Sequence, residues 1–227
     1  MKIMITHGSG GVGSAERFTA DFFRDKGFDV IVNDYFTQYD IKMLRWHEDF
    51  PDDYEMSFVE MFETIEIPDE PIYHIGFSLG GFFGIINHEK FVKNYLFYPG
   101  VLGFTEDMIN KDYSNAWVIS GMEDKGQEKY NAFKEQCVKP PLSHYYLPNT
   151  HHAFMNTDLE RSFDMVRYNI IGKCMSEEEF RSVKPNHMYM AVTYGHTNQW
   201  TILKSNEDMR WHYLNLIYED IKNVIHT

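Results

Sequence analysis

Short hydrophobic runs alternate with stretches of helical spacing along the first 157 residues of the chain. The runs have the length and the β-branched or aromatic content of buried strands, and they cover residues 2–6, 28–33, 72–77, 95–98, 116–119 and 144–147. Apolar residues recur every three or four positions between these runs, over residues 15–26, 48–70, 105–111 and 126–137. Strands that alternate with helices predict an α/β fold, in which helices cover both faces of a mainly parallel sheet.

The C-terminal part of the chain has a different pattern. Apolar residues lie on one helical face over residues 159–170 and again over residues 214–225, which predicts two helices. Between them, residues 187–193 and 199–205 alternate around a polar turn at 194–198. This alternation predicts a β-hairpin.

The length and composition favour a single domain. A chain of 227 residues with 43% hydrophobic content can bury one sizeable core, and no linker or repeat divides it. We therefore expect one domain over residues 1–227, with an insertion at about residues 173–206 before the last helix. We interpret the hairpin in this insertion as either a lid over the active site or a contact in a homodimer.

The strongest chemical signal is the sequence Gly76-Phe77-Ser78-Leu79-Gly80, which follows an apolar strand and opens an apolar helix. This G-x-S-x-G pattern is typical of a nucleophile elbow, a sharp turn that exposes the serine oxygen. Glycine on both sides of the serine allows the strand and helix backbones to approach closely. Ser78 is therefore the candidate nucleophile, and a purely structural turn is the alternative.

Two later strands end in residues that complete this chemistry. The strand at 116–119 leads to Glu123 and Asp124, and the strand at 144–147 leads to His151 and His152. A serine hydroxyl needs an imidazole to take its proton and a carboxylate to orient that imidazole. The chain order Ser78, Asp124, His152 is the order expected of an α/β-hydrolase.

Several blocks of the sequence resemble the dienelactone hydrolase family of the α/β-hydrolase fold. The resemblance runs from residue 2 to about residue 157 and rests on the blocks 7–11, 28–36, 76–81, 121–124 and 152–156. It implies a minimal α/β-hydrolase in which the amides of Ser9 and Leu79 form the oxyanion hole. The His-x-Phe pattern of the family favours His152 over His151 as the base.

Ser78 stands where the dienelactone hydrolases have a cysteine. We therefore expect a serine hydrolase of the carboxylesterase or lactone hydrolase type, which acts on a small ester or lactone through an acyl-enzyme. This chemistry requires no cofactor. The histidines outside the proposed triad are scattered without the spacing of metal ligands, so we expect no metal site either.

Charge and cysteine content exclude other classes of protein. The net charge of −13 argues against nucleic acid or an anionic membrane as a partner, because both need clustered Lys and Arg. Cys137 and Cys174 are too few for a disulfide framework, and no apolar run is long enough to span a membrane. The apolar residues at 1–5 are followed too soon by a polar, glycine-rich stretch to form a signal peptide. We therefore expect a cytoplasmic protein.

A different enzyme class competes for the first glycine-rich loop. Gly8, Gly10 and Gly13 form G-x-G-x-x-G between a strand and a helix, and Asp34 follows the next strand, as in a dinucleotide-binding site. Residues 130–134 also fit the Tyr-x-x-x-Lys motif of short-chain dehydrogenases. However, His7 takes the place of the first glycine of that family. A catalytically inactive binding protein on the α/β-hydrolase fold is the third hypothesis.

Overall fold

Six parallel strands form one sheet in the part of the chain that the structure, a computed structural model, describes. The described residues are 1–41, 57–124, 127–158, 163–166, 174–182, 200–203 and 205–225. The strands are β1 (Lys2–Thr6), β2 (Asp29–Asn33), β3 (Ile72–Phe77), β4 (Lys93–Phe97), β5 (Ala116–Gly121) and β6 (Ser143–Leu147). Each strand begins and ends within two residues of a predicted run, which confirms the strand predictions for this sheet.

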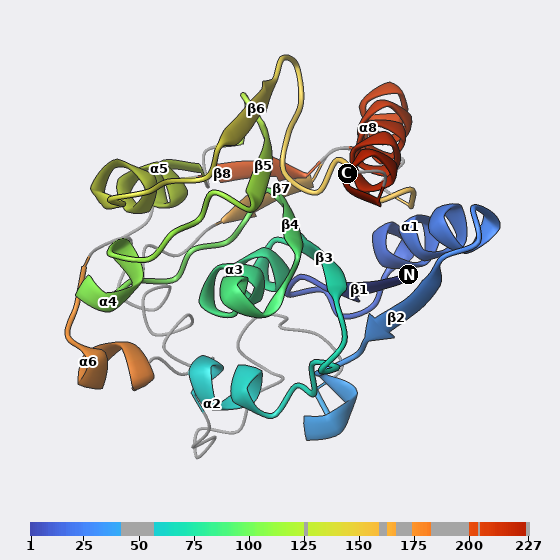
Figure 1. The fold of residues 1–227 in the computed structure, drawn as a ribbon. Helices are drawn as coiled ribbons and strands as arrows, with labels where there is room; N and C mark the ends of the chain where they lie inside the picture. Colours follow the sequence, from blue (N-terminus) through green and yellow to red (C-terminus); the bar gives the residue numbers. More distant parts are fainter. Residues whose placement is uncertain are drawn as a thin grey trace.

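The strand order across the sheet is β2-β1-β3-β4-β5-β6 (Figure 1). In the centre, Met4 of β1 pairs with Ile31 of β2 on one side and with His74 of β3 on the other. The chain runs outward from β1 to β2 and then returns across β1 to β3, so the order switches between β1 and β3. Ligands of open α/β sheets bind beyond the carboxyl ends of the strands at such a point.

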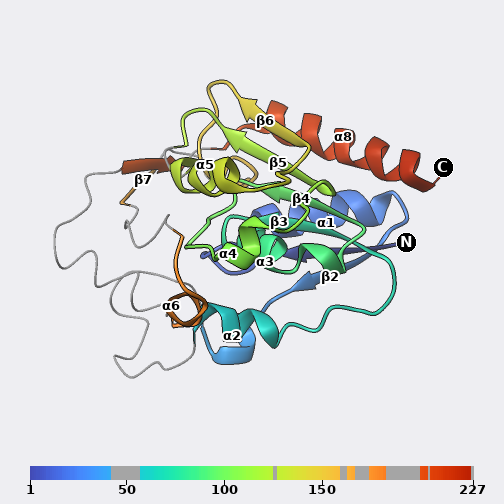
Figure 2. The same cartoon turned by 60° about the vertical axis from the view of Figure 1, so that its left-hand side comes forward.

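Helices α1 (Ser14–Asp25) and α8 (Glu207–Ile225) lie side by side on one face of the sheet (Figures 1 and 2). Successive strand side chains point to opposite faces, and Ile3 of β1 packs with Phe23 of α1 and Leu214 of α8 in one buried core. Helix α8 confirms the helix predicted at the end of the chain. No helix among the described residues is long and apolar enough to cross a membrane.

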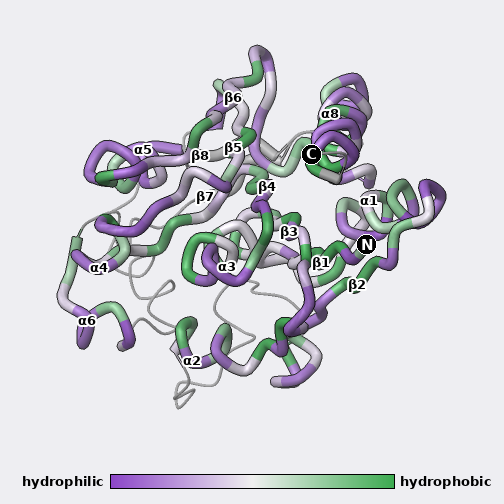
Figure 3. The backbone as a smooth tube through the Cα atoms, in the orientation of Figure 1, coloured by the Kyte–Doolittle hydropathy of each residue, from purple (hydrophilic) through white to green (hydrophobic). Residues whose placement is uncertain are grey.

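The other face of the sheet is covered by α2 (Phe58–Glu63), α3 (Leu79–Ile86), α4 (Glu106–Ile109), α5 (Gln127–Gln136) and α6 (Glu177–Arg181). Met4, Phe82 and Phe133 belong to the core on this side. Helix α3 is hydrophobic along most of its length because it is buried behind the sheet (Figure 3). Within the predicted helix at 48–70, the described helix is α2, and residues 42–56 lie outside the described part.

The prediction of a helix over residues 159–170 is wrong at its centre. Residues 163–166 form strand β7 (Phe163–Val166), which pairs antiparallel with β8 (Trp200–Leu203). A short apolar run fits either period, and the partner strand lies too far along the chain for local spacing to reveal it. Of the predicted hairpin, β8 covers part of the second arm, whereas residues 187–199 lie outside the described residues.

Candidate active site

Ser78 occupies the sharp turn between the end of β3 and the start of α3. Its backbone has φ 51° and ψ −108°, a conformation that residues with a side chain rarely adopt. The surrounding backbone holds the turn in place, since the Ser78 amide donates to the Phe97 carbonyl at 2.9 Å and the Gly100 amide donates to the Ser78 carbonyl at 2.8 Å. The strain at Ser78 is typical of a functional position.

The two glycines of the G-x-S-x-G pattern are required by close backbone contacts. A Cβ atom on Gly80 would lie 2.3 Å from the Thr6 carbonyl oxygen of β1, and one on Gly76 would lie 2.4 Å from the Gly80 carbonyl oxygen. Neither contact leaves room for a methyl group. These distances confirm the reason for the glycines that the sequence suggested.

His152 connects Ser78 to Asp124. His152 Nε2 lies 3.2 Å from Ser78 Oγ, and His152 Nδ1 lies 2.6 Å from Asp124 Oδ2. An ionised carboxylate only accepts hydrogen bonds, so Nδ1 carries the proton and donates to Asp124. Nε2 then carries no proton and can accept the proton of Ser78 Oγ, which is the arrangement of a serine nucleophile with its base.

The loops after β5 and β6 hold the two pairs of neighbouring candidates, and one residue of each pair lies in the line of contacts to Ser78. Asp124 and His152 are both 3% exposed, whereas the neighbouring Glu123 side chain is exposed to solvent. Backbone hydrogen bonds join the two loops, because the Glu123 amide donates to the Thr150 carbonyl at 3.0 Å. His151 Nδ1 is buried and has no hydrogen-bond partner among the described residues. The geometry therefore brings Ser78 together with Asp124 and His152, not with Glu123 and His151.

Tyr98 lies against the His152 ring, and no sequence motif had indicated it. The two ring centroids are 4.7 Å apart, and Phe154 closes the cluster with its centroid 5.4 Å from that of Tyr98. Tyr98 follows β4 directly with a positive φ of 39°, which turns its ring toward the carboxyl end of the sheet. Burial raises the pKa of Tyr98 well above its usual value, so its hydroxyl stays neutral. The contact between the two rings limits the movement of the imidazole.

The loop after β1 lies next to the nucleophile. A Cβ atom on Gly8 would be 3.1 Å from Ser78 Cβ, and the Gly11 amide donates to the Gly8 carbonyl at 3.2 Å. Ser9 lies inside this tight turn and is partly exposed. Leu79 is the first residue of α3, where backbone amides have no partner within the helix. The two predicted oxyanion-hole residues thus belong to the two segments that meet at Ser78.

Buried polar side chains support this loop from beneath. His7 Nδ1 donates to the Gly8 carbonyl at 2.7 Å, and its ring stacks on Tyr35 with the centroids 4.0 Å apart. Glu16 accepts a hydrogen bond from the Gly13 amide at 2.8 Å. Burial lowers the pKa of His7 to about 4 and raises the pKa of Glu16, against the effect of the backbone hydrogen bonds that Glu16 accepts. His7 is therefore neutral in the folded protein at pH 7.

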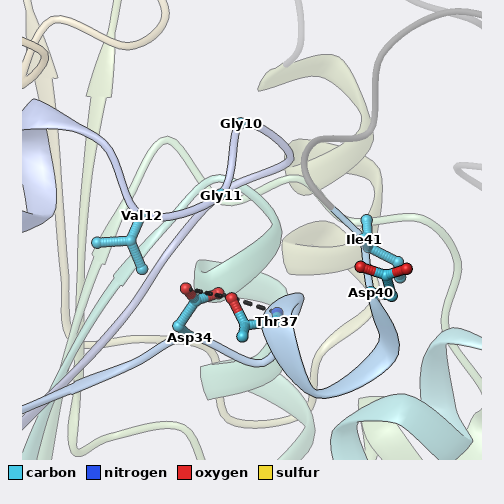
Figure 4. A pocket seen from close by; sticks show the side chains of 7 residues that line it. All are labelled: Gly10, Gly11, Val12, Asp34, Thr37, Asp40 and Ile41. Atoms are coloured by element: carbon cyan, nitrogen blue, oxygen red, sulfur yellow. Dashed lines mark hydrogen bonds between the residues drawn. The ribbon is translucent and has the colours of Figure 1, made fainter. Parts of the chain in front are cut away.

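On its outer side, the same loop borders a hollow of about 250 Å³ (Figure 4). Residues 10–12 form one wall, and Asp34, Thr37 and Asp40 lie opposite. The Asp34 carboxylate accepts hydrogen bonds from the Thr37 amide at 3.2 Å and the Thr37 hydroxyl at 2.7 Å. In a dinucleotide site this carboxylate would bind the ribose hydroxyls, but here it stabilises the short turn that follows β2.

The strand order also disagrees with the dehydrogenase hypothesis. A dinucleotide-binding sheet places its third strand beyond the second, in the order 3-2-1-4-5-6, whereas here β3 lies next to β1. Lys134 of the Tyr-x-x-x-Lys motif contacts His144 of β6, at the opposite edge of the sheet from β2. No group of three or more residues suited to hold a metal ion occurs among the described residues.

No protein-family model and no curated protein matches the chain. Among solved structures, alpha/beta hydrolase domain-containing protein 10 from mouse is similar with a TM-score of 0.50 and 12% identity, over 69% of this chain and 83% of that one. A dienelactone hydrolase from Anabaena variabilis has a TM-score of 0.48 and 14% identity, over 69% and 77%. The likeness to the mouse protein shows that the chain has the α/β-hydrolase fold, as predicted.

Proposed function

We propose that this protein is a serine hydrolase of small esters or lactones. The single observation that supports the proposal most is the line of contacts from Ser78 Oγ through His152 to Asp124, built on a strained elbow at the carboxyl end of β3. Each residue in this line comes from a different strand end. A structural turn alone would not require a buried carboxylate and an imidazole beside the serine.

The proposed reaction begins with attack of Ser78 Oγ on the ester carbonyl carbon. His152 Nε2 takes the hydroxyl proton as the C–O bond forms, and Asp124 stabilises the resulting imidazolium. The negative charge moves to the carbonyl oxygen, where the amides of Ser9 and Leu79 donate hydrogen bonds. The tetrahedral intermediate then expels the alcohol, which receives its proton from His152, and leaves an acyl group on Ser78.

Water completes the cycle by the same route in reverse. The oxygen of the water molecule bonds to the acyl carbon while His152 Nε2 accepts a proton from the water. The bond to Ser78 Oγ then breaks, Ser78 regains its proton from His152, and the acid product leaves. In a lactone the alcohol and acid remain parts of one molecule, so ring opening gives a hydroxy acid. Tyr98 keeps the imidazole within reach of Ser78 through both steps.

Covalent labelling with a fluorophosphonate tests this proposal. Such a reagent reacts with a hydroxyl that a nearby base activates and whose phosphoryl oxygen finds hydrogen-bond donors. We expect one adduct at Ser78 by intact mass and peptide mapping, with loss of activity toward a short activated ester. Ser78→Ala should abolish both labelling and hydrolysis, whereas Ser114→Ala, which changes an exposed serine, should alter neither.

An NADH titration on the same samples separates the remaining hypotheses. Saturable NADH binding without an adduct at Ser78 would overturn the proposal in favour of the dehydrogenase. An unlabelled protein that binds no NADH and hydrolyses no ester would also overturn it, and would leave the inactive binding protein as the better hypothesis.

A further inference from the structure

A chain of four side-chain hydrogen bonds runs from Asp124 away from the proposed active site. Gln127 Nε2 lies 3.1 Å from Asp124 Oδ2, and Ser120 Oγ lies 2.6 Å from Gln127 Oε1. Ser120 Oγ is also 3.2 Å from His144 Nε2, and His144 Nδ1 is 3.4 Å from Lys134 Nζ. The members come from β5, α5 and β6, so the chain joins three elements behind the catalytic acid.

The charge on Asp124 fixes the direction of every bond in this chain. A carboxylate can only accept, so the amide group of Gln127 must face it with its NH₂ and face Ser120 with its carbonyl. The Ser120 hydroxyl then donates to Gln127 and accepts from His144 Nε2–H. His144 Nδ1 is left to accept from the Lys134 ammonium, which only donates. All four donors therefore point toward Asp124.

The groups between the two charged ends are neutral, and the two nearest Asp124 are shielded from water, whereas His144 is half-buried. Ser120 is fully buried and Gln127 is 4% exposed. Burial, with a smaller effect of Lys134, lowers the pKa of His144 to about 3, and its ring lies between Tyr130 and Tyr146. Hydrogen bonds that point in one direction polarise one another, so the positive end at Lys134 adds to the donor strength at Gln127.

Gln127 and His152 meet on the same oxygen of the catalytic acid. Both the Gln127 amide and the His152 Nδ1–H donate to Asp124 Oδ2, at 3.1 and 2.6 Å. Among the described residues, Tyr98 also interacts electrostatically with Asp124, and burial keeps Tyr98 neutral. A donor on this oxygen holds the carboxylate in one orientation. It also reduces the negative charge that the carboxylate presents to the imidazole.

We propose that Gln127 is a positioning residue of the catalytic triad, and that Ser120, His144 and Lys134 set its orientation. The proposal rests on the proposed function, because the triad must operate for the positioning to affect a reaction. It predicts two effects of removing the Gln127 amide. The alignment of His152 should suffer, and the pKa of His152 should rise, because a carboxylate with one hydrogen-bond donor fewer stabilises the imidazolium more strongly.

Gln127→Met tests the proposal, because methionine has a similar size and donates no hydrogen bond. We expect kcat to fall roughly tenfold to a hundredfold, as for loss of a hydrogen bond to a charged group, with KM within about twofold of the wild type. The acid limb of the pH profile of kcat/KM should move to higher pH. The matched control is Gln136→Met, the same change at an exposed glutamine of the same helix, which should change neither quantity.

Ser120→Ala provides a second variant that leaves Gln127 in place. Loss of the Ser120 hydroxyl frees the Gln127 amide to rotate, so the changes should have the same direction as in Gln127→Met and a smaller size. Thermal melts of both variants check that they fold. A Gln127→Met protein with wild-type kcat and an unchanged acid limb would overturn the proposal, as would a Ser120→Ala effect larger than that of Gln127→Met.

The pKa of His152 measured by NMR with ¹⁵N-labelled histidine separates this proposal from the proposed function. If the wild type hydrolyses esters no faster than Ser78→Ala, the proposed function fails, but an upward shift of the His152 pKa in Gln127→Met still supports the positioning role. If hydrolysis depends on Ser78 and the His152 pKa is the same in Gln127→Met and Gln136→Met, the positioning role fails alone.

Discussion

Ser78 lies between two polar regions that are built on different principles. On the side of β1, which we call the loop side, buried side chains bond to backbone groups: His7 to the Gly8 carbonyl and Glu16 to the Gly13 amide. On the side of β5 and β6, the acid side, side chains bond to other side chains from Asp124 outward. The loop side holds the backbone of the loop after β1 in one conformation. The acid side can transmit a change of charge to Asp124.

This difference assigns separate consequences to mutations on the two sides. A change on the loop side should weaken the oxyanion hole without altering the proton affinity of His152, because its bonds end on peptide groups. A change on the acid side should move the pH profile, because its bonds end on the carboxylate that faces His152. Measurements of kcat and of the pH profile therefore distinguish the two sides.

The largest effect should come from the base itself on the acid side. His152→Ala should lower kcat by roughly four to six orders of magnitude, since among the described residues His152 is the base in contact with Ser78 Oγ. His151→Ala is the matched control at the adjacent position and should keep activity within about tenfold of the wild type. Steady-state kinetics on an activated ester measure both, and the reverse ranking would show that His151 is the base.

On the loop side, Glu16→Gln should lower kcat roughly tenfold to a hundredfold, within the range for a disturbed oxyanion hole. The amide can present only one acceptor atom in place of two, so the turn that holds Ser9 loses part of its support. The acid limb of the pH profile should stay at the wild-type position. A shift of that limb would show that Glu16 acts on the proton affinity of His152 instead.

The control for Glu16→Gln is Glu179→Gln. Glu179 makes the same kind of capping contact at the start of α6, where its carboxylate accepts from the Ser176 amide at 2.9 Å. Its replacement should lower stability by a similar amount and leave kcat unchanged. Equal losses of kcat in both variants would mean that Glu16 contributes only to helix stability.

The neutral His7 gives the loop side a dependence of stability on pH. Its folded pKa of about 4 lies below the usual 6.5, so between these values the unfolded chain binds the proton more readily. The free energy of unfolding should therefore fall as the pH drops through this window, by about 1.4 kcal/mol per pH unit from His7. Urea denaturation at pH 7, 6 and 5 measures the slope.

His7→Phe should flatten that slope by the same amount, while the ring still stacks on Tyr35. His212→Gln, a change at an exposed histidine of α8, is the control and should keep the wild-type slope. Equal slopes in all three proteins would contradict the burial of a neutral imidazole at position 7.

The smallest effect should come from the outer end of the acid side. Lys134→Met removes the charge that polarises the chain, so the acid limb of kcat/KM should move up by about a few tenths of a pH unit, with kcat nearly unchanged. Lys139→Met is the control, because Lys139 pairs with Asp112 at 2.8 Å and takes no part in the hydrogen bonds that lead to Asp124. A shift in the control as large as in Lys134→Met would assign the effect to net charge.

The central sheet could be predicted from the sequence, and the three residues of the proposed triad could be selected from it, because both depend on local patterns. Buried strands are short apolar runs between turn residues. Ser78 follows such a run directly, and Asp124 and His152 lie in the loops that follow two later runs. At residues 163–166 the helix prediction is wrong because the strand there depends on pairing with β8, almost forty residues later. Local periodicity contains no information about such a partner.

The residues that support the triad had no comparable pattern. Gln127 belongs to no motif, and His144 lies inside a strand without the spacing of a metal ligand or a catalytic group. Their roles follow from the adjacency of β5 and β6, which brings Ser120 within hydrogen-bond distance of His144. Tyr98 was placed correctly at a strand end, but its contact with His152 depends on a positive φ that the sequence does not show.

The backbone conformation of Ser78 also limits which nucleophiles evolution can place on this scaffold. At φ 51° a side chain branched at Cβ is strongly disfavoured. Threonine is therefore excluded from the elbow although it carries the same hydroxyl group. Cysteine has the unbranched shape of serine, so the same turn can present a sulfur nucleophile in place of an oxygen nucleophile without a change of backbone.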